Sequence, residues 1–224
     1  MSSTTNTART KDQLTAVFPA APHAINGKIN LNELIRVWQH VKACAQRTQT
    51  DYDQQNYLYL VLPPELWGYF SSRAYPQLPG DPGANPLYDT SAGTAENATI
   101  RDTWQLNQKY YTEDKNMNAA LVDRFLSLIP MSYNNSYEKA ELTSNPNKRF
   151  LEVLHYFWSE YGFASEEDVA ANTNNLTMPW QPHEGIEKLI DRFESAVLYG
   201  HFAKKSTYQR NSHQPLPHRR QEVW

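Results

Sequence analysis

Apolar residues recur at three- and four-residue steps in four stretches of the chain, which predicts helices, and a cap formed by Ser165 with Asp168 predicts a fifth, short helix. The helices are predicted over about 31–47, 98–129, 145–161, 165–172 and 185–202. Asn30 and Glu33 have the spacing of a capping box at the start of the first helix. The second helix is predicted to break near 114–118. The last helix carries a clean apolar stripe, which consists of Ile186, Leu189, Ile190, Phe193 and Val197.

Two stretches depart from the helical pattern. Residues 57–62 form a short apolar run that ends at Pro63-Pro64, which is typical of a buried strand or an extended segment. Residues 71–96 contain four prolines and three glycines, so a long Pro/Gly-rich surface loop is expected there. Because helical spacing dominates the rest of the chain, the predicted fold class is all-α.

The domain organisation follows from where the helical patterns begin and end. We predict a flexible leader over 1–27, with a brief helical turn near 13–18. A single helical domain is predicted over 28–203, since no internal repeat and no linker divides this stretch. Residues 204–224 are predicted to form a basic, disordered tail.

Charge is unevenly distributed along the chain. The formal net charge of −3 does not suggest that the whole molecule binds polyanions. The C-terminal stretch nevertheless gathers five basic side chains against the single acid Glu222: Lys204, Lys205, Arg210, Arg219 and Arg220. Contact with nucleic-acid phosphates needs only such charge and flexibility, so these five residues are the candidate RNA-binding residues.

Cys44 is the only cysteine, and it lies near the apolar face of the first predicted helix. It is interpreted as a small core residue rather than a nucleophile. A single thiol cannot form an internal disulfide, so nothing indicates an oxidising compartment. The polar N-terminus lacks the apolar core of a secretory signal. No run of apolar residues is long enough to span a membrane. Cytoplasmic residence without a membrane partner is therefore expected.

The residues predict no catalytic, cofactor-binding or metal site. Asp89-Thr90-Ser91 lacks the glycine of an aspartic protease motif, and one cysteine cannot supply a retroviral zinc knuckle. His155 falls inside the most apolar helix and is interpreted as a core histidine. The acidic run 166–168 lies in the first turn of a helix, where it favours the helix dipole. We therefore predict no enzymatic activity, no cofactor and no small-molecule substrate.

Four stretches, in a fixed order, carry a resemblance to a known family. They are Tyr57–Phe70 ahead of the Pro/Gly-rich loop, Ala119–Pro130 before the aromatic turn at 131–133, Arg149–Gly162, and Met178–Ala196. Arg149–Gly162 is the most specific, since it shows paired apolar residues and ends in Tyr-Gly. This order resembles the Gag capsid protein of Copia-type (Pseudoviridae) LTR retrotransposons. The resemblance covers roughly 28–203 and is densest over 119–200.

The resemblance implies a fold, a function and partners. The implied fold is a multi-helix orthogonal bundle of the capsid kind, and the implied function is self-association into particles that package element RNA. The implied partners are further copies of the chain, or full-length Gag, together with RNA. Gly185 stands where the family often has a proline. The similarity ends near residue 203, so we expect a Gag truncated before the C-terminal capsid region and the zinc knuckle.

Two other functions stay open at this stage. One is a non-assembling helical adaptor, or a truncated Gag that docks onto full-length capsids. The other is an enzyme, which requires ionisable side chains that converge in a concave pocket. The pattern of apolar residues does not separate core from interface, because both look alike in one dimension.

Overall fold

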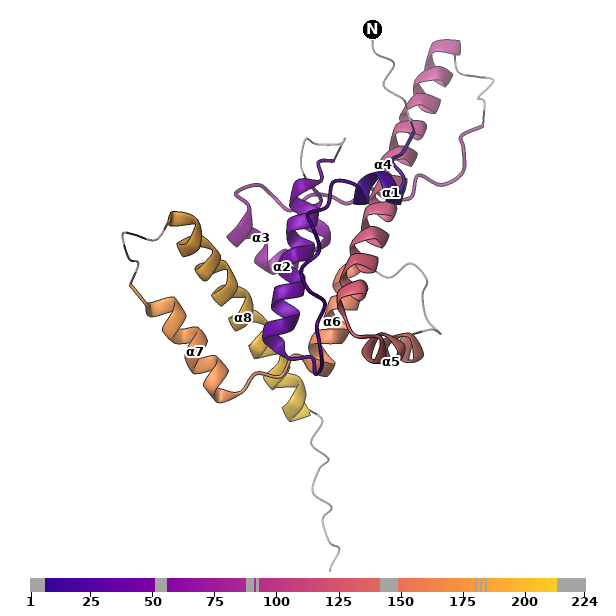
Figure 1. The fold of residues 1–224 in the computed structure, drawn as a ribbon. Coiled ribbons are helices and arrows are strands. Elements are labelled where there is room, and N and C mark those ends of the chain that lie inside the picture. Colours follow the sequence, from indigo (N-terminus) through magenta and orange to yellow (C-terminus); the bar gives the residue numbers. More distant parts are fainter. Residues whose placement is uncertain are drawn as a thin grey trace, which may run out of the picture. The chain divides into compact units, whose positions relative to one another are not determined.

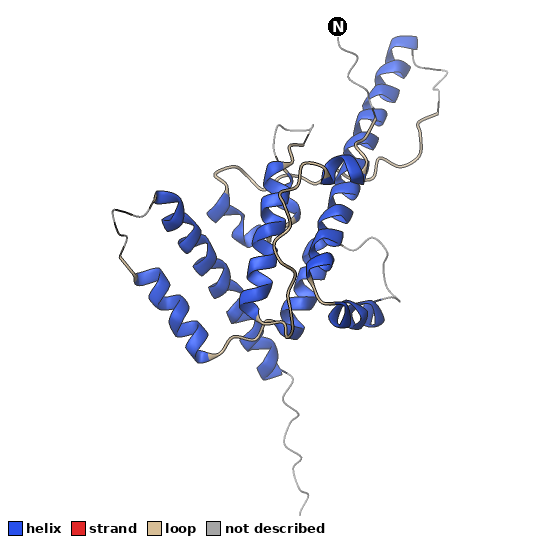
Figure 2. Cartoon of the chain, viewed as in Figure 1, coloured by secondary structure: helices blue, strands red, loops and turns tan. Residues whose placement is uncertain are grey.

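The computed structural model describes residues 7–50, 56–87, 91, 93–141, 149–179, 181, 183 and 185–212, and it leaves out the side chains of 139–141, 191 and 204–212. Within this part of the chain the regular structure is helical, apart from an isolated antiparallel bridge between Gln49 and Asn56 (Figure 2). The predicted all-α class is therefore confirmed. The elements follow in this order, with the α-helices labelled in Figure 1: α1 (Lys11–Thr15), α2 (Leu31–Arg47), the 3-10 helix η1 (Tyr57–Leu60), α3 (Pro64–Phe70), α4 (Thr94–Leu128), α5 (Met131–Glu141), α6 (Phe150–Tyr161), α7 (Glu166–Thr177) and α8 (Ile186–Ser212).

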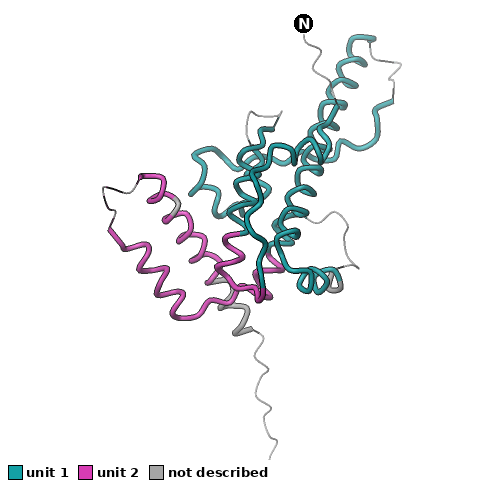
Figure 3. The backbone as a smooth tube through the Cα atoms, viewed as in Figure 1, with its two compact units in different colours: residues 1–26, 37–154 teal, residues 27–36, 155–224 magenta. Residues whose placement is uncertain are grey.

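The chain divides into two compact units (Figure 3). Unit 1 comprises residues 1–26 and 37–154, and unit 2 comprises residues 27–36 and 155–224. The sequence instead predicted one helical domain over 28–203. Two of the three internal boundaries, at 36/37 and 154/155, fall inside the continuous helices α2 and α6, and the third lies at 26/27, ahead of α2.

The core of unit 1 is built around α2. The predicted apolar face of this helix is buried, and Trp38, Val41 and Cys44 have no exposed surface. The Trp38 indole N–H donates to the buried carbonyl oxygen of Val61 at 3.0 Å. A large aromatic side chain thus enters the core with its polar group satisfied.

The apolar run after α2 is a 3-10 helix and not the predicted strand or extended segment. All four residues of η1 are buried, whereas a strand would point alternate side chains to opposite faces. The hydroxyl of Tyr59 donates to the carboxylate of Asp114 on α4 at 2.7 Å. The Asn56 side chain caps η1 by accepting a hydrogen bond from the Leu58 amide at 3.1 Å. The 3-10 turn brings four consecutive side chains into the interior of unit 1.

Helix α4 is continuous over 35 residues, so the predicted break near 114–118 is wrong. Polar residues in and beside this stretch have specific partners within unit 1. Glu113 pairs with Arg9, and Asp114 accepts the hydrogen bond from Tyr59. The Asn118 side-chain oxygen accepts a hydrogen bond from the Phe150 amide at 2.8 Å. These side chains connect α4 to its neighbours and do not interrupt it.

The N-terminal segment is attached to unit 1, which differs from the predicted flexible leader over 1–27. Helix α1 begins at a capping box formed by Thr10 and Gln13, and Leu14 in this helix is 1% exposed. The amide of Ile25 donates to the carbonyl oxygen of Leu128 at the end of α4, at 2.9 Å. The expected leader therefore contacts α4 at two points, through α1 and through Ile25.

In unit 2, α7 packs against α8 in an antiparallel hairpin (Figure 1). The predicted cap of α7 is confirmed, since Ser165 and Asp168 form a capping box. Trp158 of α6 stacks on Phe202 of α8, with ring centroids 3.7 Å apart. Gly162 ends α6 where no side chain fits, because a Cβ there would lie 2.5 Å from the Trp158 carbonyl oxygen.

Two helices of unit 2 end later than predicted. Helix α7 extends to Thr177 and α8 extends to Ser212, where ends near 172 and 202 were expected. Residues 204–212, the first part of the predicted disordered tail, are therefore helical. Their composition allows this, since Lys204 and Lys205 are good helix formers and neither proline nor glycine occurs between them and Pro215.

Candidate interaction surfaces

The predicted RNA-binding residues lie partly on α8. Lys204, Lys205 and Arg210 occupy the last turns of this helix, but their side chains are outside the described part of the structure. Arg219 and Arg220 lie outside the described residues altogether. The structure thus places three of the five positions on one helix and leaves the nucleic-acid prediction untested.

Cys44 and His40 lie on consecutive turns of α2, as a nucleophile beside a base would. The Cys44 Sγ lies 3.7 Å from the His40 Nε2. Burial raises the pKa of Cys44 to about 11, and burial together with Arg124 lowers the pKa of His40. Both shifts oppose a thiolate–imidazolium pair, so this Cys–His pair is unsuited to nucleophilic catalysis. Cys44 is a buried core residue, as predicted.

His155 is exposed, so its interpretation as a core histidine is wrong. The buried residues of α6 are spaced at three and four positions, and they include Val153, Leu154 and Phe157. His155 is two positions from both Val153 and Phe157, which places it on the opposite side of the helix. The described residues also contain no group of three or more His, Cys, Asp or Glu residues that could hold a metal ion.

A buried polar cluster joins the N-terminal segment to α4. Glu113 is 2% exposed, and its carboxylate accepts hydrogen bonds from the Arg9 guanidinium at 3.0 Å and from the Tyr57 hydroxyl at 3.2 Å. The Arg9 backbone amide donates to the same carboxylate at 2.9 Å, and Asn116 donates to the Arg9 carbonyl oxygen at 2.8 Å. Burial, followed by the negative charge of Glu113, raises the pKa of Tyr57.

The partners of this cluster come from segments far apart in the sequence, so no local pattern could reveal it. Arg9 and Glu113 are separated by 104 positions. The Arg9 guanidinium also donates to the Gln49 carbonyl oxygen at 2.9 Å. Glu113 is buried among these partners while the Arg9 side chain stays partly exposed, and the arrangement is that of a structural clamp.

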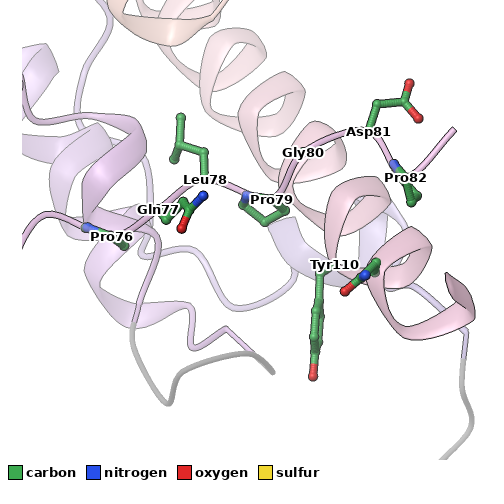
Figure 4. A pocket seen from close by; sticks show the side chains of 9 residues that line it. Pro76, Gln77, Leu78, Pro79, Gly80, Asp81, Pro82 and Tyr110 are labelled. Atoms are coloured by element: carbon green, nitrogen blue, oxygen red, sulfur yellow. The ribbon is translucent and has the colours of Figure 1, made fainter. Parts of the chain in front are cut away.

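A groove with a volume of about 640 Å³ lies between the proline-rich segment after α3 and the middle of α4 (Figure 4). Three prolines line it, at 76, 79 and 82, and Asn107 and Tyr110 contribute from α4. Asp81 is the one carboxylate among the lining residues, and Figure 4 shows its side chain pointing away from Tyr110. The groove can hold an extended or aromatic group, but it does not bring ionisable groups together.

Large apolar side chains are exposed on both units. On α8 three of the five residues of the predicted stripe are open to solvent, with Ile186 62%, Ile190 50% and Phe193 45% exposed, whereas Leu189 and Val197 are half-buried. Val169 on α7 is 46% exposed. In unit 1 the first half of α4 carries Ile100 and Leu106, which are 43% and 40% exposed. Exposed apolar surface that is contiguous marks a site of interaction, whereas scattered single residues are ordinary.

No protein-family model, curated protein or solved structure matches the chain. Among the described residues, no helix combines the length and the apolar character that a crossing of the bilayer requires. The functional interpretation therefore rests on the exposed surfaces, the groove and the charge of the chain.

Proposed function

We propose that this protein is a structural subunit that associates with copies of itself, in the manner of a Copia-type Gag capsid protein, and that it packages RNA. The observation that carries the proposal is the exposed apolar stripe of α8. Ile186, Ile190 and Phe193 have helical spacing and would be expected to face a core, yet each is about half exposed or more.

Burial of this stripe against another copy of the chain would contribute free energy to self-association. A side chain of this size stabilises a fold or a complex by about 1.5–3 kcal/mol when it moves from water into a fully packed environment. A stripe left half exposed retains a large part of that free energy for association. A shell subunit needs a helical body and a surface that meets its own copies, and it needs no reactive side chains.

RNA packaging is supported by charge and by the resemblance described above. Five basic residues follow Ala203 while the whole chain carries a net charge of −3. A capsid subunit with this distribution can bind RNA phosphates through its C-terminal end while its acidic body packs against neighbouring copies.

Sedimentation velocity and light scattering on the full chain test the proposal. The expected result is a weight-average mass that rises with concentration, together with particles in negative-stain electron micrographs. Addition of RNA should increase particle formation and should leave part of the RNA resistant to nuclease. A chain that stays monomeric at high concentration and moderate salt, with and without RNA, would contradict the proposal.

The groove beside the proline-rich segment favours a second candidate, a non-assembling binding module or a truncated Gag that docks onto full-length capsids. Three prolines and Tyr110 provide an apolar wall that an extended segment of a partner could fill. This candidate predicts a monomer that binds full-length Gag in a pull-down and loses that binding on Tyr110→Ala substitution. Self-association in the absence of any partner would count against it.

A further inference from the structure

We infer that one face of the α7–α8 hairpin is the surface through which two copies of this chain pair. We define this hairpin face by Val169 on α7 and by Ile186, Ile190 and Phe193 on α8. The inference rests on the proposed self-association, and it specifies which surface of the molecule makes the contact.

The sides by which the two helices face each other are fixed by two hydrogen bonds. The Asn172 side-chain amide donates to the Ala196 carbonyl oxygen at 3.1 Å. Nearer the turn between the helices, Arg192 donates to the carbonyl oxygen of Met178 at 2.9 Å. Asn172 on α7, and Arg192 and Ala196 on α8, therefore mark the contact line of the hairpin.

The residues of the hairpin face lie beside this line, on the same side of it. Each step along an α-helix rotates the side-chain direction by about 100°. Phe193 follows Arg192 by one position, and Thr173 follows Asn172 by one position. Because α7 and α8 run antiparallel, a rotation of the same sense along both helices leads to one common face. Val169 is four positions before Thr173 and joins that side of α7.

The hairpin face continues the spacing of the stripe along α8. Ile186, Ile190 and Phe193 follow one another at four- and three-residue steps, and Val197 adds the next position of the same row. Trp158 stacks on Phe202, which belongs to a different side of α8, so the packing of α8 on α6 leaves this row open. The exposed apolar side chains are therefore contiguous and not scattered.

The area of the hairpin face suits a second copy of the chain. Four large apolar side chains, each about half exposed, present on the order of 400 Å² of apolar surface per copy. Apolar atoms make up roughly 60% of a typical interface, so the face corresponds to about 650 Å² per copy with its polar rim. Two copies would bury about 1,300 Å², within the range of stable complexes. A two-fold axis brings the same patch of both copies together, which matches an apolar row against itself.

The principal test compares two double variants of the full chain by sedimentation velocity. I190E/F193E places four carboxylates in the paired face of two copies. I100E/L106E is the matched control, because it changes two exposed apolar residues on α4 in the same way. The hairpin variant should weaken association at least about a hundredfold, while the control associates like the unaltered chain. Circular dichroism checks that both variants keep the helix content of the unaltered chain.

The outcomes separate the inference from the proposed function. If I190E/F193E associates as strongly as the unaltered chain, the hairpin face is not the contact, although self-association stands. The same conclusion follows if both double variants are weakened equally. If the unaltered chain is itself monomeric, the proposed function fails and this inference fails with it.

Symmetric cross-linking keeps the test decisive if the charged variant does not fold. F193C is a milder change, and a two-fold contact at the hairpin face would bring the two introduced thiols within reach of a short bismaleimide. Cys44 has no exposed surface, so the unaltered chain provides the background. Dimers cross-linked in F193C, and absent from L106C, would support the inference. Association of F193C without cross-linking would overturn it.

Discussion

Glu113 illustrates how one residue fixes a whole segment of the chain. Its carboxylate is 2% exposed and holds Arg9, whose side chain is 32% exposed, and the Tyr57 hydroxyl. Glu113→Ala leaves these donors without their acceptor, and the loss should be about 3 kcal/mol, near the lower limit for breaking a buried pair because Arg9 is partly solvated. Urea unfolding followed by circular dichroism measures this loss. A Glu113→Ala chain as stable as the unaltered one would show that the clamp contributes nothing.

Cys44 should be protected in the folded protein and should make stability fall at alkaline pH. Burial raises its pKa from 9.0 to about 11, so the folded state keeps the proton that the unfolded state releases above pH 9. Unfolding then releases a proton, and stability declines as the pH rises from about 9 to about 11. Ellman's reagent should react slowly at pH 8 and fully after denaturation. Rapid labelling of the native chain would contradict this, and Cys44→Ala should flatten the alkaline decline.

The capping box of Ser165 and Asp168 should stabilise helix α7. Ser165→Ala should destabilise α7 by about 1 kcal/mol at neutral pH. Hydrogen bonds from the Ser165 side chain and backbone hold the pKa of Asp168 below its usual value of 3.8, so the cap stabilises above that pH and is lost as the pH falls through the lower folded-state pKa. The difference between Ser165→Ala and the unaltered chain, measured by urea unfolding, should therefore shrink in acid. If the stability difference between the two chains stayed the same in acid, the capping box would not be its cause.

The elements that sequence predicted best are those with a single unambiguous face. Helix α2 was predicted from 31 to 47 because its apolar positions fit only a helical period, and Trp38 and Val41 are buried as that period requires. The apolar run 57–62, which contains η1, is too short for the spacing of its apolar residues to distinguish a helical turn from a strand. The break predicted in α4 is wrong because Glu113 and Asp114 pair with residues far away in the sequence. These pairs hold the helix to its neighbours, and no local pattern reveals them.

Across the whole molecule, periodicity identified an apolar row on α8 without indicating what covers it. The amphipathic pattern of Ile186, Ile190 and Phe193 is the same for a helix that faces a core and for one that faces a partner. The exposed fractions of these side chains show that they do not lie in the core of this chain. The five basic residues were found from composition, which places charge in the sequence but not in space. Two of the boundaries between the compact units pass through α2 and α6, where a sequence offers no linker to recognise.

If the chain binds RNA as proposed, the binding should depend on salt through the charge of the C-terminal stretch. Each phosphate contact to a single strand contributes about 0.7 to the slope of log affinity against log salt concentration. Replacing Arg219 and Arg220 with serine should lower the magnitude of that slope by about 1.4 and weaken binding at low salt. Fluorescence anisotropy with a labelled RNA measures both effects. Replacing the exposed Lys28 and Arg73 instead is the control, and an equal change there would mean that net charge alone governs binding.

The clamp at Arg9 also has a consequence for the order of events during synthesis. Arg9 leaves the ribosome 104 residues before Glu113, and at typical rates of translation this interval lasts about 5–20 s. Throughout that time Leu14 and the rest of α1 have no surface to dock on, since α4 does not yet exist. The segment around α1 is therefore made before its docking surface and settles late, and a nascent chain arrested before α4 would present this segment to chaperones or proteases.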